Sequence, residues 1–260
     1  MKKICLCFFS GTGMTKYVVD KTVNEFEQHG AVVDCFKIEN TNAQDIAISK
    51  YDLFGIAYPC HASNAPQIVI DFVKKLPNAG NMNTFIIFTL GNEGELHNSS
   101  SNLLIKKLEN KGYKVFYDKL IQMPLNFIYK DPDKVVRWVL KNANEMIPLI
   151  AKDIMALKSH FMKESTHSKR KHIIGRSEWL GCRISGKFFH AKSSCVQCGI
   201  CVKNCPKQNI ALTRKSVRFK HHCNWCMRCI YACPKQSIDV RRPFKFIRFN
   251  DGWYNSDLFK

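Results

Sequence analysis

The chain has 260 residues, a formal net charge of +19 and 13 cysteines. This length predicts one large or two moderate domains with a proper hydrophobic core. The composition excludes a membrane-spanning protein, because no apolar stretch approaches the ~20 residues that a span needs. The short apolar run near the N-terminus lacks a cleavage signature, so we expect no signal peptide and a cytoplasmic chain. So many cysteines without a secretion signal predict a reducing, anaerobic setting.

The basic excess lies mostly after residue 150. A basic surface favours acidic partners, which leaves an acidic protein, nucleic acid or an anionic membrane surface open at this point.

A buried strand and a glycine-rich loop open the chain. Residues 2–9 are apolar, residues 10–15 read SGTGMT, and a helical pattern then runs to about Gly30. Unpaired N–H groups at a helix start bind anions, and hydroxyls and glycines assist. The loop lacks the lysine of a P-loop and the third glycine of a dinucleotide motif. The candidate anion-binding residues are Ser10, Gly11, Thr12, Gly13, Met14 and Thr15.

Strands and helices alternate through the rest of the first half. This order predicts an α/β domain with a doubly wound, five-stranded parallel sheet, in which three polar loops meet at the carboxyl edge. The further strands are expected at 31–38, 51–58, 84–90 and 113–123, and the further helices from Pro66, at 102–111 and at 131–158.

The S-x-T-G-x-T pattern of residues 10–15 resembles the phosphate loop of flavodoxins, and the resemblance covers residues 1–157. It implies a flavodoxin-like FMN-binding domain; the alternative is an ordinary strand-to-helix turn. The loop at 89–95 departs from the family because it holds no aromatic residue, which leaves Tyr58 and His61 as candidates for the ring. The resemblance implies flavin contacts from Tyr58, Pro59, Cys60, His61 and Ala62, and from Thr89, Leu90, Gly91, Asn92 and Gly94.

Four cysteines of this half have no motif around them. We expect Cys5, Cys7 and Cys35 to act as small apolar residues. Cys60 lies in a candidate flavin loop, but nothing beside it in the sequence lowers its pKa.

Residues 158–192 are predicted to be a basic linker or docking segment. Residues 160–176 are polar, basic and irregular, and a short docking helix is expected after them. The basic run 168–172 is interpreted as solvated. Cys182 is a poor ligand candidate, since other cysteines fill all expected positions.

Two cysteine runs, 195–206 and 223–234, share the spacing C-x2-C-x2-C-x3-C-P. This spacing is typical of [4Fe–4S] ligation, in which the fourth cysteine of each run reaches the other cluster. Disulfides fit a small secreted chain, and zinc favours cysteine pairs separated by a longer loop. The predicted sets are Cys195, Cys198, Cys201 and Cys233 for one cluster, and Cys223, Cys226, Cys229 and Cys205 for the other.

These runs resemble the bacterial two-cluster ferredoxins across residues 193–241. The resemblance implies a small α+β ferredoxin-like domain with a hairpin at 210–222. Phe219, Trp225 and Ile230 are expected to shield the clusters. Residues 242–260 form a C-terminal extension that we expect to wrap onto a domain.

The two halves together resemble flavodoxin–ferredoxin fusions. Iron–sulfur clusters pass one electron at a time and a flavin accepts one or two. The sequence therefore predicts an electron-transfer protein with two [4Fe–4S] clusters and FMN, which exchanges electrons with acidic redox proteins and binds no nucleic acid. One alternative is an FMN-dependent reductase of a small substrate, fed by the clusters. A zinc-bearing nucleic-acid-binding module ranks far below both. No catalytic residue is assigned.

Overall fold

The computed structural model describes residues 1–91, 95–125, 130–214 and 216–241, without the side chains of Arg176, Glu178 and Trp179. Within these ranges the N-terminal half forms a five-stranded parallel sheet in the order β2-β1-β3-β4-β5. This is the flavodoxin-like order, and it confirms the predicted fold class. The strands are β1 (Lys3–Phe8), β2 (Val32–Lys37), β3 (Leu53–Pro59), β4 (Met82–Leu90) and β5 (Tyr113–Gln122).

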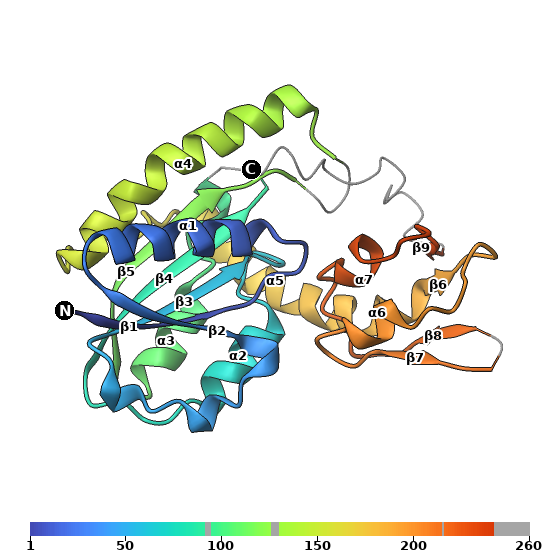
Figure 1. Cartoon of the computed structure of the whole chain (residues 1–260), viewed down its shortest axis with the longest axis horizontal. Coiled ribbons are helices and arrows are strands. Elements are labelled where there is room, and N and C mark those ends of the chain that lie inside the picture. Colours follow the sequence, from blue (N-terminus) through green and yellow to red (C-terminus); the bar gives the residue numbers. More distant parts are fainter. Residues whose placement is uncertain (92–94, 126–129, 215, 242–260) are drawn as a thin grey trace.

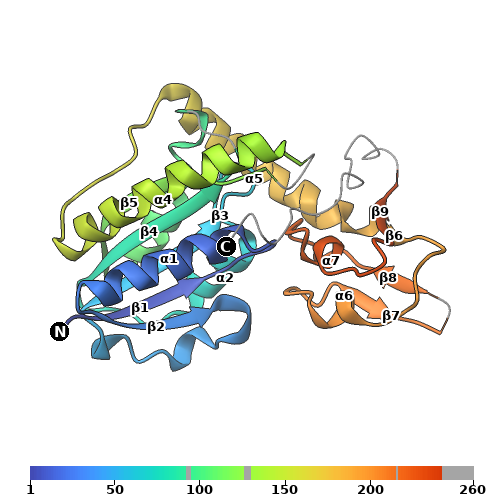
Figure 2. The same ribbon diagram turned by 45° about the horizontal axis from the view of Figure 1, so that its top comes forward.

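Helices cover both faces of this sheet (Figures 1 and 2). Helices α1 (Met14–Gln28) and α4 (Asp133–Met155) lie on one face, and α2 (Gln67–Lys75) and α3 (Asn102–Glu109) lie on the other. Each face has its own apolar core, because β1, β3, β4 and β5 are largely buried on both sides, whereas the edge strand β2 is mostly exposed. Short 3₁₀ turns occur at Ile38–Asn40, Ala43–Asp45, Ile48–Lys50, Glu95–His97 and Gly186–Phe188.

The segment after α4 differs from the prediction. Thr166–Ser185 form a 20-residue helix, α5, where irregular chain was expected over its first half. Ser165 and Ser168 form a capping box at its start. Ser168 and His172, interpreted above as part of a solvated run, are buried. That interpretation was wrong, because the basic residues occupy only the outer face of a helix whose other face packs on the sheet domain.

The C-terminal module lies beyond the carboxyl edge of the sheet, at the far end of α5 (Figure 1). Its two halves repeat with matching local structure. Positive φ angles occur at Gln197, Gly199 and Gln208, and again at Trp225, Met227 and Gln236. The predicted hairpin is confirmed. The elements are β6 (Phe189–Ala191), α6 (Ile200–Lys203), β7 (Ile210–Leu212), β8 (Val217–Phe219), α7 (Arg228–Tyr231) and β9 (Ile238–Val240), and β6 pairs with β9.

Three expectations about single features can be compared with the structure. Cys5 and Cys7 are buried in β1, as predicted. Cys35 is exposed, so its predicted role in apolar packing was wrong; it lies on β2, at the edge of the sheet. The described part of the chain contains no helix long and apolar enough to cross a membrane. The extension 242–260 lies outside the described residues.

Candidate functional site

The glycine-rich loop connects β1 to α1 at the carboxyl edge of the sheet. The Ser10 hydroxyl accepts hydrogen bonds from the backbone N–H groups of Gly13 and Lys16, both at 3.2 Å. Gly13 has a φ of 104°, and a side chain built there would meet no described atom within 4 Å. The first turn of α1 carries no acidic residue, so its partial positive charge is not neutralised locally. N–H groups, hydroxyls and an open flank are the features that a phosphate group needs.

The other two predicted flavin loops lie beside this one. Thr15 and Thr89 share a buried hydrogen bond between their hydroxyls at 2.8 Å. The Cys60 N–H donates to the Thr89 carbonyl oxygen at 2.7 Å. Loops that follow β1, β3 and β4 therefore meet at one edge, as the sequence predicts.

The loop after β3 is strained. His61 and Asn64 exchange backbone hydrogen bonds at 2.9 and 3.0 Å, and the two residues between them, Ala62 and Ser63, both have φ near 52°. This is the conformation of a type I′ turn, which normally takes glycine or asparagine. Such strain persists only when surrounding contacts hold it. Here Asn64 donates its side-chain amide to the Ala62 and His172 carbonyl oxygens, so α5 helps to hold the turn.

The remaining predicted flavin contacts differ in exposure. The Tyr58 ring is fully buried and stacks on Phe88 at 5.9 Å, which are the contacts of a core aromatic residue. Burial also raises the Tyr58 pKa well above its usual range. Leu90 and Gly91 are partly exposed, and the Leu90 carbonyl accepts from the Met123 N–H. Pro59 is also partly exposed. Asn92 and Gly94 lie outside the described residues.

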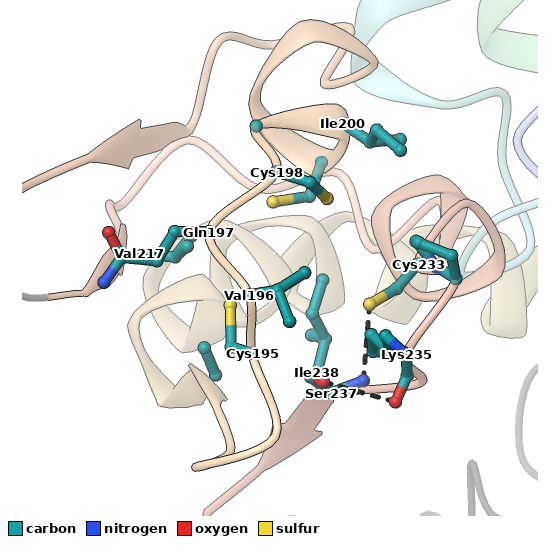
Figure 3. A pocket seen from close by; sticks show the side chains of 14 residues that line it. Cys195, Val196, Gln197, Cys198, Ile200, Val217, Cys233, Lys235, Ser237 and Ile238 are labelled. Carbon is teal, nitrogen blue, oxygen red and sulfur yellow. Dashed lines mark hydrogen bonds between the residues drawn. The ribbon is translucent and has the colours of Figure 1, made fainter.

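One predicted cysteine set lines a single pocket in the C-terminal module. The pocket walls include Cys195, Cys198 and Cys201 from the first run and Cys233 from the second. Figure 3 shows the sulfur atoms of Cys195, Cys198 and Cys233 around a shared space. The fourth cysteine of the second run therefore lies with the first three of the other run, which is the crossed arrangement that the spacing predicts.

The second set lies closer to the sheet domain. Burial raises the pKa of Cys226 to about 11 and that of Cys229 well above its usual range, and the nearby Cys205 thiol raises both further. Burial likewise raises the pKa of Cys223, with smaller contributions from Cys226 and Cys205. Four thiolates can share this space only when positive charge neutralises them, as bound iron does.

Backbone N–H groups point at several of these sulfur atoms. Asn209 N–H donates to Cys205 Sγ at 3.2 Å, and Ser237 N–H donates to Cys233 Sγ at 3.3 Å, four residues after each fourth cysteine. Trp225 N–H donates to Cys223 Sγ at 3.3 Å. Such bonds help to set cluster potentials. Within the described ranges no group of three or more His, Cys, Asp or Glu side chains is arranged for a single metal ion.

The second cysteine run packs directly against the glycine-rich loop. A side chain at Gly11 would overlap the Cys226 carbonyl group. Arg228 donates to the Ser10 carbonyl oxygen at 2.5 Å and forms an ion pair with Glu39 at 2.6 Å. Its guanidinium also lies over the Phe9 ring, 5.4 Å from the centroid. One arginine therefore connects the two halves of the molecule at the predicted phosphate loop.

The strained turn after β3 touches the same cysteine run. The His61 ring hydrogen-bonds to the backbone of Asn224, the residue after Cys223. Burial is the larger effect and lowers the pKa of His61 to about 4. His61 is thus a neutral ring at physiological pH, placed between a predicted flavin loop and a predicted cluster loop.

Sequence reasoning missed the residues that join the two halves. Arg228 and Glu39 carried no motif, and they are 189 positions apart. Cys182 was dismissed as a ligand, yet it lies near enough to Cys223 to raise the pKa of that thiol slightly. A weak signal for α5 did exist, because Ser165 and Ser168 have the spacing of a capping box, with serine in place of the usual Glu or Gln.

Comparison with protein families identifies the C-terminal module. Residues 187–234 match the family model described as a 4Fe-4S dicluster domain. The chain joins a domain of flavodoxin-like fold to a region that matches the 4Fe-4S dicluster model. The matched range of the dicluster domain contains both cysteine runs in full. The match supports iron–sulfur binding by the dicluster domain.

Solved structures that resemble the flavodoxin-like domain are distant in sequence. The flavodoxin of Streptococcus pneumoniae TIGR4 has 15% identity and a TM-score of 0.44, and the match covers 59% of this chain and 98% of that one. The two-electron-reduced flavodoxin of Megasphaera elsdenii has 20% identity and a TM-score of 0.41, with coverage of 57% and 98%. Rubredoxin oxygen:oxidoreductase from Desulfovibrio gigas has 15% identity and a TM-score of 0.44, with coverage of 60% and 37%. A comparison with curated proteins finds no match.

Proposed function

We propose that this protein transfers electrons between two [4Fe–4S] clusters and FMN within one chain. The observation that carries the proposal is the contact between the second cysteine run and the glycine-rich loop, where the Cys226 backbone lies against Gly11 and Arg228 binds Ser10. A cluster held by this run would be the inner one, next to the flavin loops. The clusters supply one-electron steps and the flavin links them to two-electron chemistry.

The chain's own residues have distinct roles in this proposal. Cys195, Cys198, Cys201 and Cys233 hold the outer cluster, and Cys223, Cys226, Cys229 and Cys205 hold the inner one. Residues 10–15 bind the FMN phosphate through backbone N–H groups and hydroxyls, on the open flank of Gly13. The second and third loops, at 58–62 and 89–94, border the ring.

The outer cluster is the exchange point with an external carrier. Cys198 is exposed, and the neighbouring Val196 side chain is 60% exposed. Lys203 and Lys235 are exposed in the same module. An apolar patch beside basic side chains fits an acidic redox protein, which charge attraction would steer to this face.

Composition of the purified protein tests the proposal. Anaerobic purification should yield about eight irons, about eight acid-labile sulfides and one FMN per chain. Two zinc ions without flavin would refute it. Replacing Thr12 and Thr15 with glutamate should expel the flavin and leave the iron content unchanged, because negative charge at the phosphate loop repels the phosphate while the cysteines are untouched. If iron were lost together with flavin, the two cofactor sites would not be separable in the way we propose.

A second candidate is an FMN-dependent reductase of a small substrate. It is favoured by the third loop, which has no aromatic residue to cover the ring. A reductase would reoxidise its reduced flavin when a small substrate is added alone. An electron carrier would do so only with a protein partner, so rapid-mixing experiments under anaerobic conditions separate the two.

A further inference from the structure

A cavity of about 430 Å³ lies between the two halves of the molecule. Its walls come from α2, the C-terminal end of α5 and the loop that leads into the second cysteine run. Volumes of roughly 300–1,000 Å³ are typical of small-molecule sites. Arg183 and Leu180 are exposed, so this part of the wall opens to solvent.

The cavity is distinct from both proposed cofactor sites. Of the four cysteines assigned to the inner cluster, only Cys223 lines it, and Cys205, Cys226 and Cys229 do not. Of the three flavin loops, only His61 contributes a described side chain. A molecule bound in this cavity would contact the side that Cys223 lines, and it would not compete with either cofactor for its binding residues.

Positive charge exceeds negative charge among the described side chains of the cavity. Lys207 forms an ion pair with Asp71 at 3.3 Å. Arg183 has no carboxylate partner among the described residues; its guanidinium donates instead to Nδ1 of His222 at 3.2 Å. One guanidinium therefore retains donors for an anion.

We propose that this cavity binds a small organic carboxylate, held by Arg183 and Lys207 against the Cys223 wall. A planar guanidinium binds a carboxylate through two parallel hydrogen bonds. The cavity has one more positive than negative side chain, so a single carboxylate neutralises it. A dianionic phosphate would add a second negative charge beside the cluster thiolates, which are themselves negative. The binding site does not require the flavin. Its effect on the inner cluster rests on the proposed function: an added negative charge beside Cys223 disfavours the reduced cluster and lowers its potential.

Isothermal titration calorimetry on the anaerobic full-length protein tests the binding. The probes are the monocarboxylates acetate, propionate and pyruvate, with inorganic phosphate and chloride at matched ionic strength. At least one carboxylate should bind, and Arg183→Gln or Lys207→Gln should weaken it about tenfold or more. Matched controls are Arg218→Gln and Lys203→Gln, which replace exposed residues outside the cavity and should leave the affinity unchanged. No binding by any carboxylate, tighter binding of phosphate, or equal affinity in Arg183→Gln would overturn the proposal.

A redox titration separates this inference from the proposed function. Iron and flavin are measured first on the same sample. With clusters present, the bound carboxylate should lower the potential of the inner cluster, and Arg183→Gln should abolish that shift. If the iron is absent but the carboxylate still binds through Arg183, the proposed function fails and the binding site stands. If the clusters are present and no carboxylate binds, only the cavity assignment fails.

Discussion

Replacing Arg228 with methionine removes the charged contact between the two halves and keeps a side chain of similar length. The change deletes the hydrogen bond to Ser10 and the ion pair with Glu39, whose side chain is only 9% exposed. The second carboxylate oxygen of Glu39 already has no hydrogen-bond partner among the described residues, so the carboxylate would be left buried and unpaired. Hydrogen bonds to charged groups contribute about 1.5–3 kcal/mol each. Since Arg228 keeps some solvent contact, we expect a total loss of about 3 kcal/mol, or a 100-fold change in the docking equilibrium.

Hydrogen–deuterium exchange measures this equilibrium directly. Amides at the contact exchange through local opening, so their rates follow the opening free energy. Peptides covering residues 9–16 and 222–231 should exchange about 100-fold faster in Arg228→Met than in the wild type, by the same arithmetic. Peptides from β4 should be unaffected, because that strand lies in the centre of the core.

A double-mutant cycle shows whether the ion pair causes the effect. Glu39→Gln removes the buried charge, so adding it to Arg228→Met should recover about 1–2 kcal/mol. Arg218→Met is the matched control, since Arg218 is exposed and forms no described ion pair. Unchanged exchange in Arg228→Met, or strictly additive effects in the cycle, would refute the reasoning.

Three further changes test other parts of the structure. Gly175→Ala should destabilise the protein by about 1–3 kcal/mol in thermal melting, because the added methyl overlaps the Ala62 carbonyl oxygen. Gly181→Ala is the control in the same helix. It has open space around it, so it should be neutral or stabilising by up to ~1 kcal/mol. The folded pKa of His61 is about 4, below its unfolded value of ~6.5. Between these two pH values the unfolded chain binds more protons than the folded one. The free energy of unfolding therefore falls as the pH drops through this window. In urea titrations at pH 6.5 and 4.5, His61→Gln should lose up to about 2 kcal/mol less stability than the wild type. An equal loss would contradict the lowered pKa of His61. Cys233→Ser should lower the iron content from about eight to about four. It should spare the inner cluster, although Cys233 belongs to the second run. Loss of the inner cluster instead would exclude crossed ligation.

The fold class could be predicted from the sequence, and the candidate cofactor residues could be named from it, because their signals are local. Apolar runs such as residues 84–90 predict buried strands, and the cysteine spacing is a property of a dozen consecutive residues. The glycine-rich loop was found for the same reason, since it follows a strand and precedes a helix.

The joint between the halves was not accessible, because its contacts are long-range. The ion pair of Arg228 with Glu39 depends on how two segments far apart in the sequence meet. The first half of α5 was mistaken for an irregular linker because its basic residues suggested solvent on all sides. Ser168 and His172 are in fact buried against the sheet domain. Cys35 was assigned to the core by analogy with Cys5, but β2 lies at the edge of the sheet.

The crossed cysteine pocket has a consequence for biogenesis. Cys195, Cys198 and Cys201 emerge from the ribosome before Cys233, the residue that completes their pocket. A nascent or truncated polypeptide that stops short of Cys233 has three of the four cysteines of this pocket and lacks the fourth. The four-cysteine pocket is therefore complete only after Cys233 has been synthesised and has folded back against the first run.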